Sequence, residues 1–283
     1  MIKIIESPRE GMQGFSRVMT TAEKVRYIDH LLHVGFDTIE IGSIVSPRII
    51  PQMADSMEVL KKLDLTGTGS NVMFLAVNDR GAEILAGIDE ITHISYPFSF
   101  SPTFLKHNVN STVEQSLKTT EVITGLCENS GKNAVIYISM AFGNMYGDQW
   151  SIGILAEWVR KLYDAGARII QLSNVSVEVE PKLIHTVYST LIPMFPDIEF
   201  GLHLHTSNKK WYEKVNAAYT AGCRRFDGVI NGWGGCPMAG KELLGNLKTE
   251  NLIAFADERS ATGVKFNRIA LQDAYNVAGE IFK

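Results

Sequence analysis

The stretch 231–240 (NGWGGCPMAG) combines glycines, a proline and one thiol. This composition is unsuited to the interior of a helix or strand, because glycine loses the most backbone entropy and proline lacks an N–H donor. The sequence therefore predicts a shaped loop that can approach a ligand closely, with Cys236 at its centre. A thiol with an ordinary pKa of about 8.5 could donate a proton to carbon at neutral pH. The alternative is a tight turn that holds an inert cysteine.

Two histidines, His203 and His205, are two residues apart in a strand-like run, so both imidazoles point to one face. They could hold one divalent ion or form a hydrogen-bonded pair. Glu10 could add an anionic oxygen ligand and Asn246 a neutral one. Oxygen and imidazole ligands without a thiolate favour Mg²⁺ or Mn²⁺. The alternatives are a solvated loop acid for Glu10 and a helix cap for Asn246.

Arg9 precedes Glu10 in the segment 8–13 (PREGMQ). Because its guanidinium never loses its proton, Arg9 could bind a carboxylate or stabilise a developing enolate oxygen. It could also pair with Glu6 or Glu40, and the two roles are compatible. Further polar residues that follow strand-like runs are candidates for substrate binding: Gln13, Glu40, Ser139 and Asn174.

The elements that must position these side chains alternate regularly along the chain. Short β-branched or apolar runs predict strands at 2–5, 38–41, 71–76, 90–95, 133–138, 169–172, 199–203 and 225–230. Segments of helical period predict helices near 21–34, 51–63, 79–87, 112–130, 151–165, 180–193, 208–221 and 247–258. Thr20 or Thr21 could cap the first helix.

Eight such units without a break in composition predict an α/β fold, a (β/α)8 TIM barrel in a single domain over residues 1–283. A doubly wound sheet is the alternative, but no Gly-x-Gly-x-x-Gly turn follows the first strand. In such a barrel the chemistry lies where the strands end and the βα loops begin. The candidate residues all fall at that rim.

The composition, with 45% hydrophobic and 20% charged residues, is typical of a soluble globular protein. A net charge of −4 without basic runs argues against nucleic acid or anionic membrane as a partner. Three widely spaced cysteines, no signal-like N-terminus and no apolar run of membrane-spanning length favour a reducing cytoplasm.

The motifs together resemble the 3-hydroxy-3-methylglutaryl-CoA lyase family, a group within the metal-dependent (β/α)8 lyases and Claisen-type synthases. The motifs that carry the resemblance, in chain order, are 7–13 (SPREGMQ), Ile39-Glu40, 46–48 (SPR), 51–53 (PQM), 203–205 (HLH), 232–237 (GWGGCP) and Gly245-Asn246. The Gly-Gly-Cys-Pro loop is the most specific, because the synthase and aldolase relatives lack its cysteine. The resemblance covers nearly the whole chain.

The resemblance implies His203, His205 and Asn246 as metal ligands, with Glu10 in place of the family's aspartate. It further implies Arg9 and Cys236 as catalytic residues and Glu40 as a pocket residue. The implied reaction is retro-Claisen cleavage of a small-molecule acyl-CoA substrate, 3-hydroxy-3-methylglutaryl-CoA or a related 3-hydroxyacyl-CoA, to acetyl-CoA and a 3-oxo acid. A homodimer is expected.

The chain departs from the family pattern at two further points. The family's Gly-Asp-Thr after the sixth strand is replaced by Ser173-Asn174-Val175, and Thr206 replaces the usual acid after the histidine pair. Two other functions therefore stay open. One is a metal-dependent aldolase or Claisen-type synthase acting on a 2-oxo acid, and the other is a ligand-binding barrel without catalysis.

Overall fold

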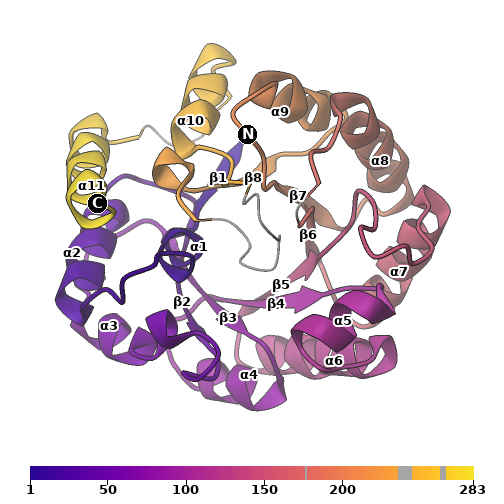
Figure 1. The fold of residues 1–283 in the computed structure, drawn as a ribbon, viewed down its shortest axis with the longest axis horizontal. Coiled ribbons are helices and arrows are strands. Elements are labelled where there is room, and N and C mark those ends of the chain that lie inside the picture. Colours follow the sequence, from indigo (N-terminus) through magenta and orange to yellow (C-terminus); the bar gives the residue numbers. More distant parts are fainter. Residues whose placement is uncertain (176, 235–243, 262–265) are drawn as a thin grey trace.

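Eight parallel strands close into a barrel in chain order, β1 to β8, as shown in Figure 1. The structure is a computed structural model that describes residues 1–175, 177–234, 244–261 and 266–283. The strands are β1 Lys3–Glu6, β2 Thr38–Ile44, β3 Asn71–Ala76, β4 His93–Phe98, β5 Asn133–Ile138, β6 Ile169–Ser173, β7 Glu199–His203 and β8 Arg225–Gly228. The predicted (β/α)8 barrel is confirmed.

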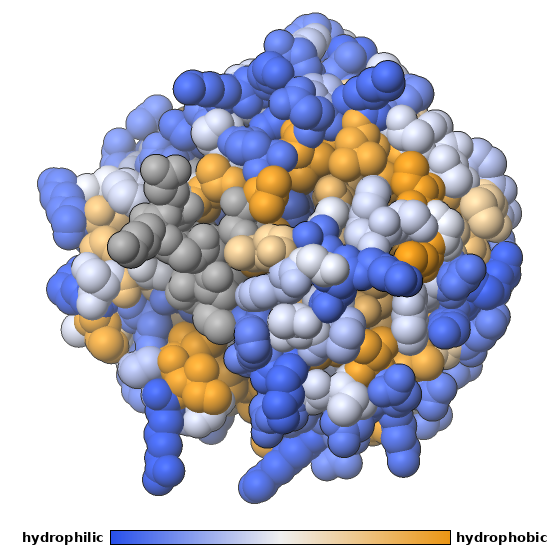
Figure 2. Space-filling model, turned by 45° about the vertical axis from the view of Figure 1, so that its right-hand side comes forward, coloured by the Kyte–Doolittle hydropathy of each residue, from blue (hydrophilic) through white to orange (hydrophobic). Residues whose placement is uncertain are grey.

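Helices surround the barrel on its outer side (Figure 1). Those that follow the strands are α2 Thr21–Leu32, α3 Ser56–Lys62, α4 Asp79–Ala86, α6 Val113–Asn129, α7 Ile152–Asp164, α8 Pro181–Met194, α9 Trp211–Thr220 and α10 Thr249–Glu258. Thr20 caps α2 in a capping box with Glu23, as the sequence predicted. No helix within the described ranges is long and apolar enough to cross a bilayer. Figure 2 shows one face of the molecule, on which patches of hydrophobic residues lie among hydrophilic ones.

The core has two parts because the strands are apolar on both faces. Inside the barrel, Ile5, Met73, Val135 and Tyr137 pack on one another. A larger cluster fills the layer between the strands and the helices. Burial on both faces is typical of a parallel sheet enclosed by helices.

One row of the barrel interior depends on a missing side chain. Gln171, Gly201 and Arg225 are register partners on β6, β7 and β8. A Cβ atom at Gly201 would lie 1.2 Å from Oε1 of Gln171. The Gln171 carboxamide therefore occupies the space that a side chain at position 201 would need.

Several predicted elements differ in extent from those observed, among them β2, which continues to Ile44 instead of ending at 41. β4 covers His93–Phe98 instead of 90–95, because a turn holds Ile91 N on Ile88 O at 3.2 Å. β8 ends at Gly228 instead of Ile230, because Ile230–Gly232 forms a 3-10 turn (η2) with Asn231 at φ 59°. The predicted helix 51–63 is divided into a 3-10 turn, η1 Pro51–Met53, and α3.

Three helices of the described residues were not predicted. They are α1 Pro8–Gln13, α5 Pro102–Asn108 and α11 Arg268–Ile281. α1 and α5 lie in βα connections and begin at a proline, which suits the first turn of a helix. α11 packs beside α2 on the outside of the barrel (Figure 1). Since α1 carries Arg9, Glu10 and Gln13, these residues lie on a helix and not on the loop that the sequence suggested.

Candidate active site

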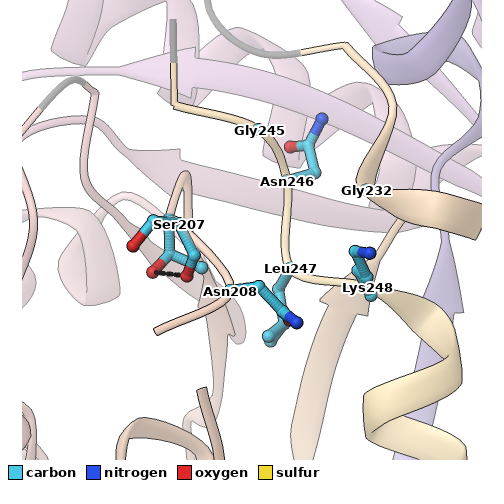
Figure 3. Close-up of a pocket in the computed structure, with 8 residues that line it drawn as sticks. Ser207, Asn208, Gly232, Gly245, Asn246, Leu247 and Lys248 are labelled. Atoms are coloured by element: carbon cyan, nitrogen blue, oxygen red, sulfur yellow. Dashed lines mark hydrogen bonds between the residues drawn. The ribbon is translucent and has the colours of Figure 1, made fainter. Parts of the chain in front are cut away.

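A cavity of about 370 Å³ opens at the carboxyl ends of the strands. The predicted site residues that line it are Arg9, Glu10, Gln13, Ser139, Asn174, His203 and His205. Asn246 lines a neighbouring cavity of about 190 Å³, together with Ser207 and Lys248 (Figure 3). Glu40 lies beneath Arg9, and Cys236 falls outside the described residues.

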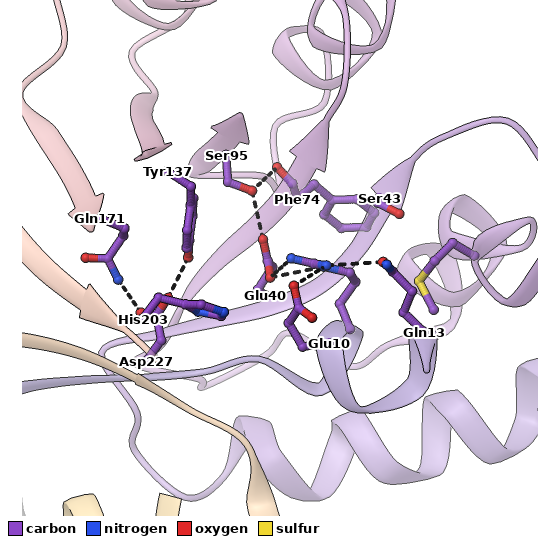
Figure 4. A network of polar contacts seen from close by, with 12 residues as sticks. Glu10, Gln13, Glu40, Ser43, Phe74, Ser95, Tyr137, Gln171, His203 and Asp227 are labelled. Atoms are coloured by element: carbon purple, nitrogen blue, oxygen red, sulfur yellow. Dashed lines mark hydrogen bonds and ion pairs between the residues drawn. The ribbon is translucent and has the colours of Figure 1, made fainter. Parts of the chain in front are cut away.

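Arg9 is held on the cavity floor by two carboxylates. Its Nε and Nη2 donate to Oε2 of Glu40 at 3.1 and 2.6 Å, and its Nη1 donates to Oε1 of Glu10 at 2.6 Å. Nη1 also donates to Gln13 at 3.2 Å, and Glu40 accepts from Ser95 at 2.8 Å (Figure 4). The ion pair of Arg9 with Glu40, one of the roles considered from the sequence, is thus present. These contacts hold the guanidinium of Arg9 in one place at the edge of the cavity, which Arg9 lines.

Helix α1 supplies Arg9, Glu10 and Gln13, and strand β2 supplies Glu40. α1 starts directly after β1, so Arg9 enters the rim, and Gln13 follows four residues later on the same helix face. Burial lowers the pKa of Arg9, but Glu10 and Glu40 outweigh it and the net pKa is raised. Burial raises the pKa of Glu10, but Arg9 and the two histidines lower it by more, so that the net pKa is about 2. Glu10 is therefore an anion at every physiological pH.

A buried aspartate that the sequence analysis did not single out, Asp227, supports His203. Its Oδ2 lies 3.0 Å from His203 Nδ1 and accepts from the Tyr137 hydroxyl at 2.8 Å, while Oδ1 accepts from Gln171 (Figure 4). Burial lowers the pKa of His203, but Asp227 and Glu10 raise it by more. An acid in the middle of an apolar strand run, Phe226-Asp227-Gly228, was the signal that could have identified it.

The two imidazoles lie together, as the spacing predicted. The ring centroids of His203 and His205 are 5.0 Å apart at an interplanar angle of 74°. Burial, and then His203, lower the pKa of His205 to about 4, so His205 is neutral. Its buried Nδ1 has no hydrogen-bond partner among the described residues. A neutral imidazole with a free nitrogen is a metal ligand type.

Asn246 approaches from the β8 side. It is paired with His205 in an isolated antiparallel bridge, and its Nδ2 donates to Trp233 O at 2.8 Å. Its buried Oδ1 is without a partner in the described part of the chain. The residue that caps α10 is Lys248, so Asn246 is not the helix cap considered as an alternative.

The donor types fit a divalent cation, although no three His, Cys, Asp or Glu side chains in residues 1–175, 177–234, 244–261 and 266–283 surround one point as ligands. Glu10 is turned to Arg9. Asn246, which offers its oxygen, is an amide and falls outside that set of residue types. The orphaned Nδ1 of His205 and Oδ1 of Asn246 are the observations that favour a cation here.

A family model described as HMGL-like matches residues 2–277. The chain belongs to the HMGL-like family. The mitochondrial hydroxymethylglutaryl-CoA lyase of Pongo abelii is 30% identical over 272 residues, which cover 95% of this chain and 82% of the relative. The (R)-citramalyl-CoA lyase of Chloroflexus aurantiacus is 29% identical over 256 residues, covering 87% and 80%.

Solved structures agree with this HMGL-like assignment. An HMG-CoA lyase from Bacillus subtilis superimposes with a TM-score of 0.90 at 26% identity, covering 100% of this chain and 94% of that one. An HMG-CoA lyase from Acinetobacter baumannii, in complex with coenzyme A and 3-methylmalate, gives 0.89 at 25% identity, covering 100% and 91%. As a member of the HMGL-like family, the chain is a carbon–carbon lyase.

Proposed function

We propose that this lyase cleaves a 3-hydroxyacyl-CoA that carries a free carboxylate, 3-hydroxy-3-methylglutaryl-CoA or a close analogue, in a divalent-metal-dependent retro-Claisen reaction. The hydroxyl proton leaves, the bond between C2 and C3 breaks, and C3 becomes the carbonyl carbon of a 3-oxo acid. The electron pair remains on C2 as a thioester enolate, which takes up a proton to give acetyl-CoA. The family relatives named as acyl-CoA lyases support this substrate class.

The observation that carries the proposal is the Arg9 guanidinium, which lines the cavity and is held by Glu40 and Glu10. Its five N–H groups make four contacts with these carboxylates and Gln13, which leaves one N–H without a protein partner among the described residues. A fixed cationic donor stabilises an enolate oxygen without reorganisation. We therefore assign enolate stabilisation to Arg9.

The charges around Arg9 support a divalent cation. Glu10 and Glu40 are two buried or nearly buried carboxylates against one guanidinium, which leaves an excess of one negative charge when both are ionised. An anionic substrate would be repelled by such a floor alone. Glu10, His203, His205 and Asn246 would hold Mg²⁺ or Mn²⁺. When bound, the ion would lower the pKa of the substrate hydroxyl and orient it.

The other side chains of the cavity have simpler proposed roles. Gln13 and the hydroxyl of Ser139 line the cavity and could orient the substrate. Val45, Leu75 and Phe104 form an apolar wall that reduces the access of water to the enolate. Cys236 is proposed as the acid that protonates C2. The homodimer and the cytoplasmic location stay predictions.

A second candidate is cleavage of citramalyl-CoA to acetyl-CoA and pyruvate. It is favoured by the Chloroflexus relative, which matches this chain at nearly the same identity as the hydroxymethylglutaryl-CoA lyases. The reaction breaks the same kind of carbon–carbon bond but releases a 2-oxo acid. A 2-oxo acid is also the substrate of the aldolase or synthase considered from the sequence.

The test is a substrate panel on the purified chain. After treatment with EDTA and refilling with Mg²⁺ or Mn²⁺, release of acetyl-CoA is measured from 3-hydroxy-3-methylglutaryl-CoA and from both enantiomers of citramalyl-CoA. We expect metal-dependent release from one of them and its loss in Cys236→Ala with the metal content intact. Cleavage that survives EDTA, or no release from any of these thioesters, would refute the proposal.

A further inference from the structure

The backbone after β7 stays extended beyond the end of the strand. β7 ends at His203, yet on the β8 side Leu247 N donates to Leu204 O at 3.0 Å and Thr206 N donates to Gly245 O at 2.7 Å. These two bonds belong to the isolated antiparallel bridge between His205 and Asn246, which lies beyond the parallel β7–β8 ladder. On the β6 side no strand is available, because β6 ends at Ser173.

The Asn174 side chain fills this gap. Its Oδ1 accepts from His205 N at 2.8 Å, and its Nδ2 donates to His205 O at 2.8 Å. A carboxamide that pairs with the N–H and C=O of one residue does what a neighbouring strand would do. Nδ2 also donates to Val177 O at 2.8 Å, so both of its hydrogens are used.

A second contact holds the same two loops together. Glu178, four residues after Asn174, accepts from Ser207 N at 2.5 Å and from Thr206 Oγ1 at 2.9 Å. The buried Lys214 on α9 donates to Glu178 and, at 2.6 Å, to Thr206 Oγ1. The segment that carries His205 is thus fixed from both sides, while Nδ1 of the His205 ring has no hydrogen-bond partner in the part of the chain that the structure describes.

We infer that Asn174 is a positioning residue that orients His205 as a ligand, and this rests on the metal site of the proposed function. A metal-binding histidine is usually oriented by a hydrogen bond to its second ring nitrogen. Here the main chain of His205 is clamped instead, by a 4% exposed amide whose polar atoms are all engaged. Asn174 lines the cavity, but its amide is committed to the protein and not to the substrate.

Asn174→Ala tests this inference, because it removes both hydrogen bonds to the main chain of His205 without adding a charge. We expect loss of this clamp to raise the dissociation constant for Mn²⁺ about 10- to 100-fold.

The experiment titrates Mn²⁺ into the metal-free full chain by calorimetry or electron paramagnetic resonance, alongside thermal unfolding in EDTA. Asn174→Leu keeps the size of the side chain, also removes both hydrogen bonds, and serves if the alanine variant does not fold. Asn71→Ala is the matched control, because the Asn71 Nδ2 donates to Asp37 O at 3.0 Å at the amino end of β3, away from the cavity. The control should bind Mn²⁺ like the wild type.

Unchanged or tighter Mn²⁺ binding in the Asn174 variants would overturn the inference, and so would equal weakening in Asn71→Ala. A wild-type chain that binds no Mn²⁺ would instead overturn the metal site of the proposed function, and with it the ligand role of His205. The two failures are therefore distinguishable by the wild-type titration.

Discussion

Oδ2 of Asp227 on β8 lies 3.0 Å from Nδ1 of His203 on the adjacent strand β7. A buried carboxylate at this nitrogen holds the Nδ1–H tautomer and leaves Nε2 as the basic atom of the ring. Tyr137 and Gln171 donate to the same carboxylate and keep it in place. The orientation of His203 therefore depends on a residue that does not itself line the cavity.

Asp227→Asn should lower kcat/KM for acyl-CoA cleavage by about 10- to 100-fold, because an amide can present an N–H to Nδ1 and disfavour the required tautomer. The measurement is the initial rate of acetyl-CoA release. Glu199→Gln, at the opposite end of β7, is the control and should keep the wild-type rate. Equal rates for Asp227→Asn and the wild type would show that the pair is only structural.

Arg9→Lys should lower kcat by about 10²- to 10³-fold, with a smaller effect on KM. Lysine keeps the charge but lacks the planar fork that Glu40 and Glu10 hold at 2.6 Å each. Steady-state kinetics with the preferred thioester measure both constants. Arg26→Lys changes an ion pair whose side chains are 53% exposed and should have no effect. A larger change in KM than in kcat would assign Arg9 to ground-state binding.

Glu6 should make the protein less stable as the pH rises from about 5 to 9. Burial raises its pKa to about 8 from 4.5, against the hydrogen bonds from Thr249 and Ile230. Between these values the native state holds a proton that the unfolded chain has released, so the free energy of unfolding falls with pH, by on the order of a few kcal/mol.

Glu6→Gln imitates the protonated form and should remove this part of the pH dependence. Urea unfolding at pH 5, 7 and 9 measures it, and the variant should gain most at pH 9 relative to the wild type. Glu58→Gln, in an exposed pair with Lys62, should leave the profile as it is. Parallel profiles for Glu6→Gln and the wild type would contradict the assignment.

Phe282→Ala should reduce both stability and kcat. Phe282 is 3% exposed and stacks on Trp233, with centroids 5.5 Å apart and an interplanar angle of 12°. Its loss should cost about 3–5 kcal/mol, measured by chemical unfolding. Trp233 begins the segment that leads to Cys236, so turnover should fall as well. Phe195→Ala, at the end of α8, should cost similar stability without a change in kcat; equal kcat losses would deny Phe282 a special role.

The barrel could be predicted because strand-like and helix-like periods alternate along the chain. A barrel of such units places Arg9, His203 and His205 at one rim. The short helices α1 and α5 were not, since six or seven residues are too few to display a period. The partners of the site residues were harder still. That Asp227 meets His203, or that Asn174 clamps His205, depends on which residues of adjacent strands are opposite each other, and that register is set by the closed sheet.

Because Gly201 has no side chain, the substitutions that positions 201 and 171 tolerate depend on each other. Because the Gln171 carboxamide occupies the volume of the absent Cβ, alanine at 201 becomes acceptable only when position 171 shortens in the same step. Gln171 also donates to Asp227, so such an exchange would remove one support of His203. A laboratory library that varies the two positions independently should therefore recover active chains almost entirely with the glycine retained, and repacking of the barrel interior has to be designed in pairs.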